Sequence, residues 1–231
     1  MIVAYGAAAF AARNVTNTVP ILAIAPDARL GVVVGGLKRP GGNITAITTD
    51  VVALMPKRLE LLKAIAPRVA KVVILTSEGR AAAAVAEIEA SAGTLGLTVA
   101  WIKVEALEQM EAGLAQVLDE KADAILVDDT QITFARRRTI AEFALQHRLP
   151  TISAYQEFVE AGGLLAYDAN AGEITRLAAS YVDKILKGTK PSDLPVVRPA
   201  VFDLVVNART ARALGLAIPP ALQLRITRIV E

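Results

Sequence analysis

Polar side chains that can bind a small molecule follow several short apolar runs, at points where predicted strands end. In open α/β sheets, ligands bind outside the carboxyl ends of the strands, where loops and helix N-termini converge. No nucleophile in this set stands beside a base, so the set favours binding over catalysis. The candidate ligand-binding residues are Tyr5, Gly6, Thr76, Ser77, Asp128, Asp129, Thr130, Tyr155, Tyr167 and Asp168.

Asp128 and Asp129 are adjacent carboxylates, and Thr130 follows them. Two carboxylates after a strand can hold the ammonium group of a ligand, or Mg²⁺. Alternatively, one of them caps a helix that starts near Ile132 while the other is solvated. The residues alone leave these alternatives open, and we predict no metal site.

Thr76 and Ser77 precede a predicted helix that opens through Gly79. Free backbone N–H groups at its start could bind a carboxylate or a phosphate. Equally, a hydroxyl could simply cap the helix. The sequence has neither the Gly-x-Gly-x-x-Gly of dinucleotide sites nor the Gly-Lys-Ser/Thr of phosphate-binding loops, so we expect no nucleotide and no other cofactor.

Aromatic residues make up only 4% of the chain, which draws attention to Tyr155 and Tyr167 at strand ends. Two rings that line a cleft could hold an apolar or aromatic side chain; ordinary core or surface positions are the alternative. Residues 136–138 are three arginines, but consecutive helical residues point in different directions, so we expect a solvated face. His147 lies late in the same predicted helix, where a cation suits the helix dipole, and we interpret it as structural.

Short apolar runs that alternate with amphipathic helical patterns must position these residues. The runs are mostly continuous, as in strands that helices cover on both faces. Repeated alternation of strand and helix predicts an α/β fold of doubly wound parallel sheets. The predicted strands lie near residues 2–5, 21–25, 44–48, 72–76, 99–104, 124–127, 151–154, 164–167 and 202–206, with helices that include 57–65, 108–121 and 172–187.

The composition restricts the function further. The chain has 231 residues, of which 54% are hydrophobic, enough for one large core or two small ones. A net charge of +2 gives no reason to expect nucleic acid or an anionic membrane as partner. Cysteine is absent and histidine occurs once, which argues against thiolate metal sites and a His-based triad. The first six residues lack the three-part form of a signal peptide, and no uncharged apolar run is long enough to span a bilayer.

Several segments, by their order and spacing, resemble the ABC transporter substrate-binding protein family that includes tryptophan- and tyrosine-type receptors. The resemblance covers essentially the whole chain. Its segments are Val19–Ile21, Arg39–Thr45, Lys57–Lys63, His147–Pro150, Glu157–Leu164, Tyr181–Gly188, Asp193–Pro195, Asn207–Leu216 and Ile218–Pro220.

The resemblance implies the type 1 periplasmic binding protein fold, with two doubly wound lobes around a hinge and the ligand in the cleft between them. The first lobe is expected to comprise residues 1–68 and 170–231, and the second residues 69–169. Family members usually begin with a signal peptide and two further βα units ahead of the strand at residues 2–5. We therefore expect an incomplete first lobe with this strand as an exposed apolar edge, which a homodimer could cover.

The function that the resemblance implies is that of a periplasmic solute receptor, which delivers an amino acid, with aromatic ones among the candidates, to an ABC permease. The ligand carboxylate is assigned to Ser77 and neighbouring helix amides, and the ammonium to Asp128 or Asp129. The ligand side chain is assigned to a space between Tyr5, Tyr155 and Tyr167. A sensory or regulatory domain of the same fold is an alternative, although no DNA-binding or kinase segment is present. A nucleotide-dependent α/β enzyme is a third class, which the missing glycine fingerprints disfavour.

Overall fold

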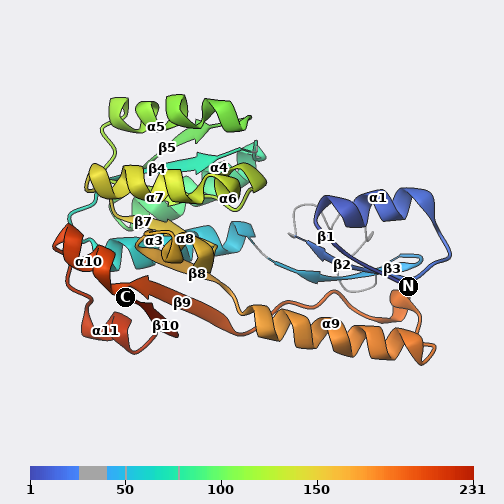
Figure 1. Ribbon diagram of the computed structural model, residues 1–231. Helices are drawn as coiled ribbons and strands as arrows, with labels where there is room; N and C mark the ends of the chain where they lie inside the picture. The colour runs from blue at the N-terminus through green and yellow to red at the C-terminus, as the bar shows by residue number, and fades with distance from the viewer. Residues whose placement is uncertain (26–40, 50, 78) are drawn as a thin grey trace. The chain divides into compact units, whose positions relative to one another are not determined.

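The computed structural model describes residues 1–25, 41–49, 51–77 and 79–231, and the chain divides into two compact units (Figure 1). Unit 1 comprises Met1–Ala53 and Ala169–Phe202, and unit 2 comprises Leu54–Asp168 and Asp203–Glu231. The chain therefore passes between the units three times. The segments 54–68 and 203–231, expected in the first lobe, are grouped with unit 2. Of the segment Arg39–Thr45, which carries part of the family resemblance, residues 39 and 40 lie outside the described residues.

Eight of the nine predicted strands coincide with observed strands to within one residue at each end, and the strand predicted at 164–167 runs on to Ala169. The strands are β1 (Ile2–Tyr5), β2 (Ile21–Ala25), β3 (Ile44–Thr48), β4 (Lys71–Thr76), β5 (Thr98–Lys103), β6 (Ala124–Val127), β7 (Thr151–Ser153), β8 (Leu165–Ala169), β9 (Phe202–Asn207) and β10 (Arg228–Val230). The α-helices are α1 (Ala7–Val15), α3 (Val51–Ile65), α4 (Ala82–Thr94), α5 (Met110–Asp119), α6 (Gln131–Ala135), α7 (Arg137–Gln146), α8 (Gln156–Glu160), α9 (Ala171–Leu186), α10 (Ala208–Leu214) and α11 (Pro220–Gln223), with 3₁₀ turns η1 (Leu107–Gln109) and η2 (Pro191–Asp193).

Unit 1 is built on a parallel sheet in the order β1-β2-β3, with α1 on one face and α9 on the other (Figure 1). The side chains of β2 alternate between two cores, because successive strand residues point to opposite faces. Ile21 and Ala23 pack in the core beneath α1, whereas Leu22 and Ile24 pack with Tyr181 of α9. Both faces of β2 are thus buried, as its continuous apolar sequence predicts.

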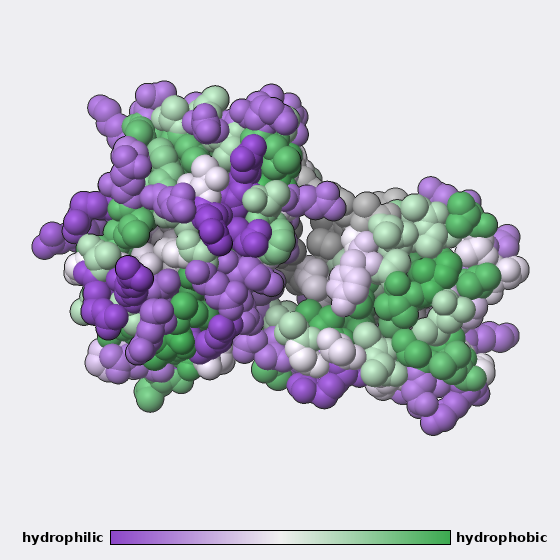
Figure 2. Space-filling model, in the orientation of Figure 1, coloured by the Kyte–Doolittle hydropathy of each residue, from purple (hydrophilic) through white to green (hydrophobic). Residues whose placement is uncertain are grey.

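Strand β1 is the open edge of this sheet. The N–H groups of Ile2 and Gly6 donate to the carbonyls of Pro20 and Ile24 at 2.8 and 2.9 Å, so those of Val3 and Tyr5 point away from β2. The side chains of Val3 and Tyr5 are 45% and 64% exposed. Figure 2 shows hydrophobic residues gathered on the visible face of unit 1. The predicted exposed apolar edge is therefore present among the described residues.

Unit 2 is built on a larger sheet in the order β10-β9-β8-β7-β6-β4-β5. Its two faces carry separate cores, and β4 contributes to both. Val72 and Ile74 pack with α3 and α4, whereas Val73 and Leu75 pack with α5 and α7. This alternation within one continuous apolar strand confirms the prediction of a sheet wound on both sides.

Strand β9 departs from the predicted parallel arrangement. The N–H of Asn207, at its end, donates to the carbonyl of Leu164 beside the start of β8, and the N–H of Asn170 donates to the carbonyl of Val201. These bonds join opposite ends of the two strands, so β9 runs antiparallel to β8. Strand β10, which the sequence did not predict, pairs parallel with β9. The sheet is thus mixed at one edge and parallel from β8 to β5.

Strand β5 forms the other edge of this sheet and carries Trp101, the only tryptophan of the chain. The indole is half-buried against the core that α3 and α4 cover, and its Nε1–H donates to Glu89 Oε1 at 3.2 Å. Among the helices that the structure describes, none combines the length and apolar composition that a membrane crossing requires.

Candidate functional site

Strands β4, β6 and β7 of unit 2 are neighbours in the sheet, and their carboxyl ends bring several of the predicted residues together. Asp128, directly after β6, is fully buried. Its Oδ2 accepts a hydrogen bond from the Thr76 hydroxyl at 2.7 Å, and its Oδ1 accepts one from the N–H of Asp129 at 2.8 Å. A buried carboxylate needs such partners, because moving its charge out of water costs on the order of several kcal/mol unless that charge is paired.

Arg80 supplies the opposite charge. Its Nη2 lies 2.5 Å from each carboxylate oxygen of Asp128, and the two side chains are 14% and 1% exposed. Sequence reasoning missed this residue because it lies between β4 and α4, in a stretch with no periodic pattern. The one signal that could have found it is that an aspartate directly after a buried strand, if itself buried, requires a cation nearby. We call Thr76, Arg80, Asp128, Asp129, Thr130 and Tyr155 the Asp128 cluster.

Asp129 lies in different surroundings from Asp128. It is half-buried, and the Tyr155 hydroxyl donates to its Oδ1. Burial and the nearby Asp129 carboxylate raise the pKa of Tyr155 far above its ordinary range. Within the described part of the chain, Asp129 Oδ2 has no hydrogen-bond partner. The cluster contains one positive and two negative side chains, and the unbalanced negative charge lies on Asp129.

The ring of Tyr155, whose hydroxyl contacts this carboxylate, packs against a second aromatic ring. The Tyr155 ring meets Phe134 of α6 edge to face, with centroids 4.8 Å apart. The Arg137 guanidinium lies 4.6 Å from the centroid of the Phe134 ring, and its Nη1 donates to the Phe134 carbonyl at 2.9 Å. Phe134 was not predicted as a site residue, since its place in α6 gave no sign that it would meet Tyr155.

Two predicted helix starts are corrected by the structure. The residue that caps α6 is Thr130, not an aspartate: its hydroxyl accepts from the N–H of Thr133 at 3.3 Å in a capping box. The helix expected to open at Ser77 begins only at Ala82. The backbone N–H of Ser77 is therefore not part of a helix N-terminus, although Ser77 itself lies half-buried directly after β4.

Tyr167 and Asp168 form a second group, at the carboxyl end of β8, around the buried Arg58 of α3. Arg58 is fully buried; its Nε donates to the Tyr167 carbonyl at 2.9 Å, and its Nη2 lies 3.5 Å from Asp168 Oδ1. Partial burial raises the pKa of Tyr167. Arg58 thus fixes the end of β8 just before the chain enters unit 1.

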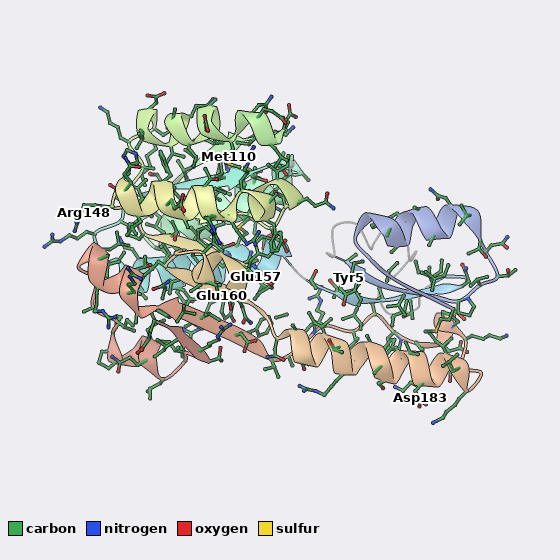
Figure 3. The ribbon with its side chains drawn as sticks, viewed as in Figure 1. Tyr5, Met110, Arg148, Glu157, Glu160 and Asp183 are labelled. Atoms are coloured by element: carbon green, nitrogen blue, oxygen red, sulfur yellow. The ribbon has the colours of Figure 1, made fainter. Side chains whose placement is uncertain are left out.

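The remaining predicted site residues, Tyr5 and Gly6, belong to unit 1. Tyr5 lies at the end of the edge strand β1 with its side chain largely exposed (Figure 3). Gly6 caps α1 with a positive φ of 50°, which glycine adopts without strain because it has no Cβ. The structure thus gathers five predicted residues in the Asp128 cluster, and two more around Arg58.

The arginine run and the histidine are placed as follows. The predicted single helix through residues 136–138 is broken, because Arg136 leaves the helical conformation between α6 and α7. Arg138 is exposed, but the other two are half-buried. His147 is the C-cap of α7, with its ring against Phe143 at 4.5 Å, which agrees with a structural role. The described residues include no group of three or more His, Cys, Asp or Glu that could hold a metal ion.

Two α/β units on parallel-dominated sheets, with polar residues at the carboxyl ends of the strands, define an α/β protein of the periplasmic binding protein-like class. The sequence matches the family described as ABC transporter substrate binding protein over residues 1–230. The chain therefore belongs to the family of ABC transporter substrate-binding proteins.

Known proteins similar to this chain agree with this assignment. The chain is 23% identical to a tyrosine-binding protein of Clostridioides difficile (strain R20291), and the match takes in 89% of this chain but only 60% of that relative. A structure of an ABC domain in complex with L-Trp from Streptococcus pneumonia is similar with a TM-score of 0.87 and 26% identity, over 100% of this chain and 80% of that one. The ligand-free, open structure of a substrate-binding protein with adhesive properties from Clostridium difficile has a TM-score of 0.75 and 26% identity, over 99% of this chain and 78% of that one.

Proposed function

We propose that this protein is the solute receptor of an ABC importer and that it binds an amino acid with an aromatic side chain, without catalysing a reaction on it. The observation that carries the proposal is the half-buried carboxylate of Asp129 in the Asp128 cluster, which accepts the Tyr155 hydroxyl while the Tyr155 ring packs against Phe134. A carboxylate can bind the ammonium group of an amino acid, and aromatic rings nearby can contact its aromatic side chain. The two relatives that bind tyrosine and L-Trp support the same ligand class.

Asp129 is the acceptor that we propose for the ligand ammonium. Asp128 is buried and its oxygens already have three donors, from Thr76, Arg80 and Asp129. Asp129 keeps one oxygen without a partner among the described residues, and the hydroxyl of Tyr155 fixes the carboxylate through the other oxygen. Of the two adjacent aspartates, Asp129 is therefore the one that we assign to the ligand, because it is the more accessible.

The rest of the ligand site is proposed by family resemblance. The ligand would lie between the two units, where Tyr5 and Gly6 from unit 1 and Ser77, Tyr167 and Asp168 from unit 2 would complete its surroundings. Closure of the units around the ligand would then present the loaded receptor to an ABC permease, in the periplasm or outside the cell.

A thermal-shift screen of the twenty amino acids tests this function. We expect L-tryptophan or L-tyrosine to raise the midpoint of unfolding, since a ligand that binds only the folded state stabilises it. Asp129→Asn should abolish the shift, and Asp119→Asn, at an exposed position at the end of α5, should preserve it. No shift with any amino acid would contradict the proposal.

We propose further that a second copy of the chain covers the open edge of unit 1. An antiparallel pair of β1 strands about a twofold axis at Ala4 would set Val3 opposite Tyr5 of the partner subunit. The outward N–H and carbonyl groups of these residues could then exchange hydrogen bonds. The exposed side chains of Val3 and Tyr5 lie on the same face of the sheet and would form two cross-strand pairs.

A further inference from the structure

We propose that Arg80 binds the carboxylate of the amino-acid ligand and that Asp128 is the positioning residue that holds Arg80 in place. This inference rests on the proposed amino-acid function. It assigns the carboxylate to a charged side chain, because the backbone at Ser77 is not the start of a helix. Arginine suits this role, since its planar fork of donors matches the two oxygens of a carboxylate.

Asp128 has no capacity left for a ligand of its own. Its side chain is 1% exposed, and both oxygens are bonded to Arg80 Nη2 at 2.5 Å. The Thr76 hydroxyl and the N–H of Asp129 add two further donors. A carboxylate so enclosed orients the guanidinium but cannot reach a second cation.

Arg80 does have donors to offer. Asp128 engages only Nη2, so the N–H groups of Nε and Nη1 remain. Nε is buried and has no acceptor among the residues that the structure describes. An unpaired buried donor is unfavourable, and a carboxylate that reached it would gain a charge-assisted hydrogen bond.

The arrangement of charges matches an α-amino acid. Arg80 and Asp129 are linked through one atom, since both donate to Asp128 Oδ1. The Arg80 guanidinium and the backbone of Asp129 thus contact the same buried carboxylate, so a cation and the half-buried Asp129 carboxylate belong to neighbouring residues of one cluster. The ammonium and carboxylate of an α-amino acid are separated by a single carbon, so the proposal assigns them to two residues that meet at one atom, Asp129 and Arg80.

Isothermal titration calorimetry with matched ligands tests the assignment. L-Tryptophanamide keeps the ammonium and the indole of L-tryptophan but replaces the carboxylate with a neutral amide; L-tyrosine and L-tyrosinamide form a second pair. The proteins are the full chain and its variants Arg80→Gln, Arg80→Gln/Asp128→Asn and Arg138→Gln. The double variant replaces the buried ion pair with a neutral pair of similar shape, so that the fold does not have to bury an unpaired carboxylate. Arg138 is exposed and serves as the matched control.

We expect the full chain and Arg138→Gln to prefer the amino acid over its amide by about tenfold or more, the range of a charge-assisted hydrogen bond. In both Arg80 variants this preference should fall to about threefold or less. An unchanged preference in a folded Arg80 variant would overturn the assignment while leaving the proposed function intact. Tighter binding of the amino acid to Arg80→Gln would also overturn the assignment. That result would mean that Arg80 blocks Asp128 and that the ligand binds Asp128 when Arg80 is removed. If the unmodified chain binds neither amino acid, the proposed function itself fails, and the assignment with it.

Discussion

Asp128 and Asp129 carry the same side chain but have different roles in the structure. Successive residues after a strand point in opposite directions, so Asp128 enters the protein and Asp129 faces partly outward. Asp128 is bonded to Arg80 and Thr76, whereas Asp129 receives the hydroxyl of Tyr155. At the scale of residues, the pair therefore separates a buried, fully bonded carboxylate from the half-buried one that we propose as the ligand acceptor.

The partly buried hydroxyl of Tyr155 should make stability depend on pH in the alkaline range. Burial and Asp129 raise its pKa in the folded state, whereas an exposed tyrosine ionises near ~10. The folded state then holds its proton more tightly, so stability is fully present below pH ~10 and falls as the pH rises further. Tyr155→Phe should lose about 1 kcal/mol at neutral pH, for the missing hydrogen bond, but show a shallower alkaline decline.

Urea unfolding at pH 8 and at pH 10.5 measures both effects. Tyr167 and Tyr181 are also shifted upward by burial, so some decline should remain in the variant. An alkaline decline as steep in Tyr155→Phe as in the unmodified chain would contradict the prediction.

The sequence predicted part of this site, and the reason is strand-end position. Thr76 ends β4, and Asp128, Asp129, Thr130 and Tyr155 follow β6 or β7 within three residues, so parallel pairing was enough to gather them. Arg80 and Arg58 were not predicted, because a buried guanidinium is recognised by its partners and not by its spacing in the sequence. The partners come from 48 and 109 positions away in the chain, a separation that no local pattern can report.

At the scale of elements, the parallel strands were predictable because each is a continuous apolar run between helices. The antiparallel direction of β9 was not predictable, since the direction of a strand depends on how the chain returns to the sheet. Helix α9 and the segment after it carry the chain through unit 1 before β9 begins. Helix α3 also begins earlier than predicted and continues through Pro56, because packing against the sheet of unit 2 outweighs local propensity.

Gly163, between α8 and β8, should be irreplaceable for reasons of space. A methyl group at this position would lie 2.1 Å from Cε1 of Phe158, which is fully buried. Because a packed core yields little, Gly163→Ala should destabilise unit 2 by about 1–3 kcal/mol or more.

Gly93 in α4 is the matched control. Nothing lies within 4 Å of the methyl group that Gly93→Ala would add, and alanine favours a helix over glycine. This variant should be neutral or more stable by up to about 1 kcal/mol. Chemical denaturation of both variants compares them, and equal stability of the two would contradict the steric argument.

At the scale of the molecule, the two units differ in how well their sheets are enclosed. The seven-stranded sheet of unit 2 carries a core on each face. In unit 1, β1 leaves two outward residues exposed among the described elements. An open apolar edge favours strand pairing with another chain.

Val3→Pro should disrupt the proposed dimer without unfolding unit 1. Proline lacks an N–H, and that of Val3 points away from β2, so the bonds within the sheet are preserved. We expect the unmodified chain to elute as a dimer in size-exclusion chromatography with light scattering, and Val3→Pro as a monomer. Val15→Lys, which removes an 82% exposed apolar side chain at the end of α1, should remain dimeric. A stable, folded monomer of the unmodified chain would contradict the proposed dimer.

The position of Trp101 gives the protein an intrinsic fluorescent probe that reports on one of its two units. The indole lies on β5 at the edge of unit 2, and it is the only one in the chain, so its fluorescence reports the melting of that unit alone. Circular dichroism, by contrast, sums over both units. If the two signals follow separate denaturation curves, the units melt as independent cooperative blocks; if the curves coincide, the three passages of the chain between them are enough to couple their melting.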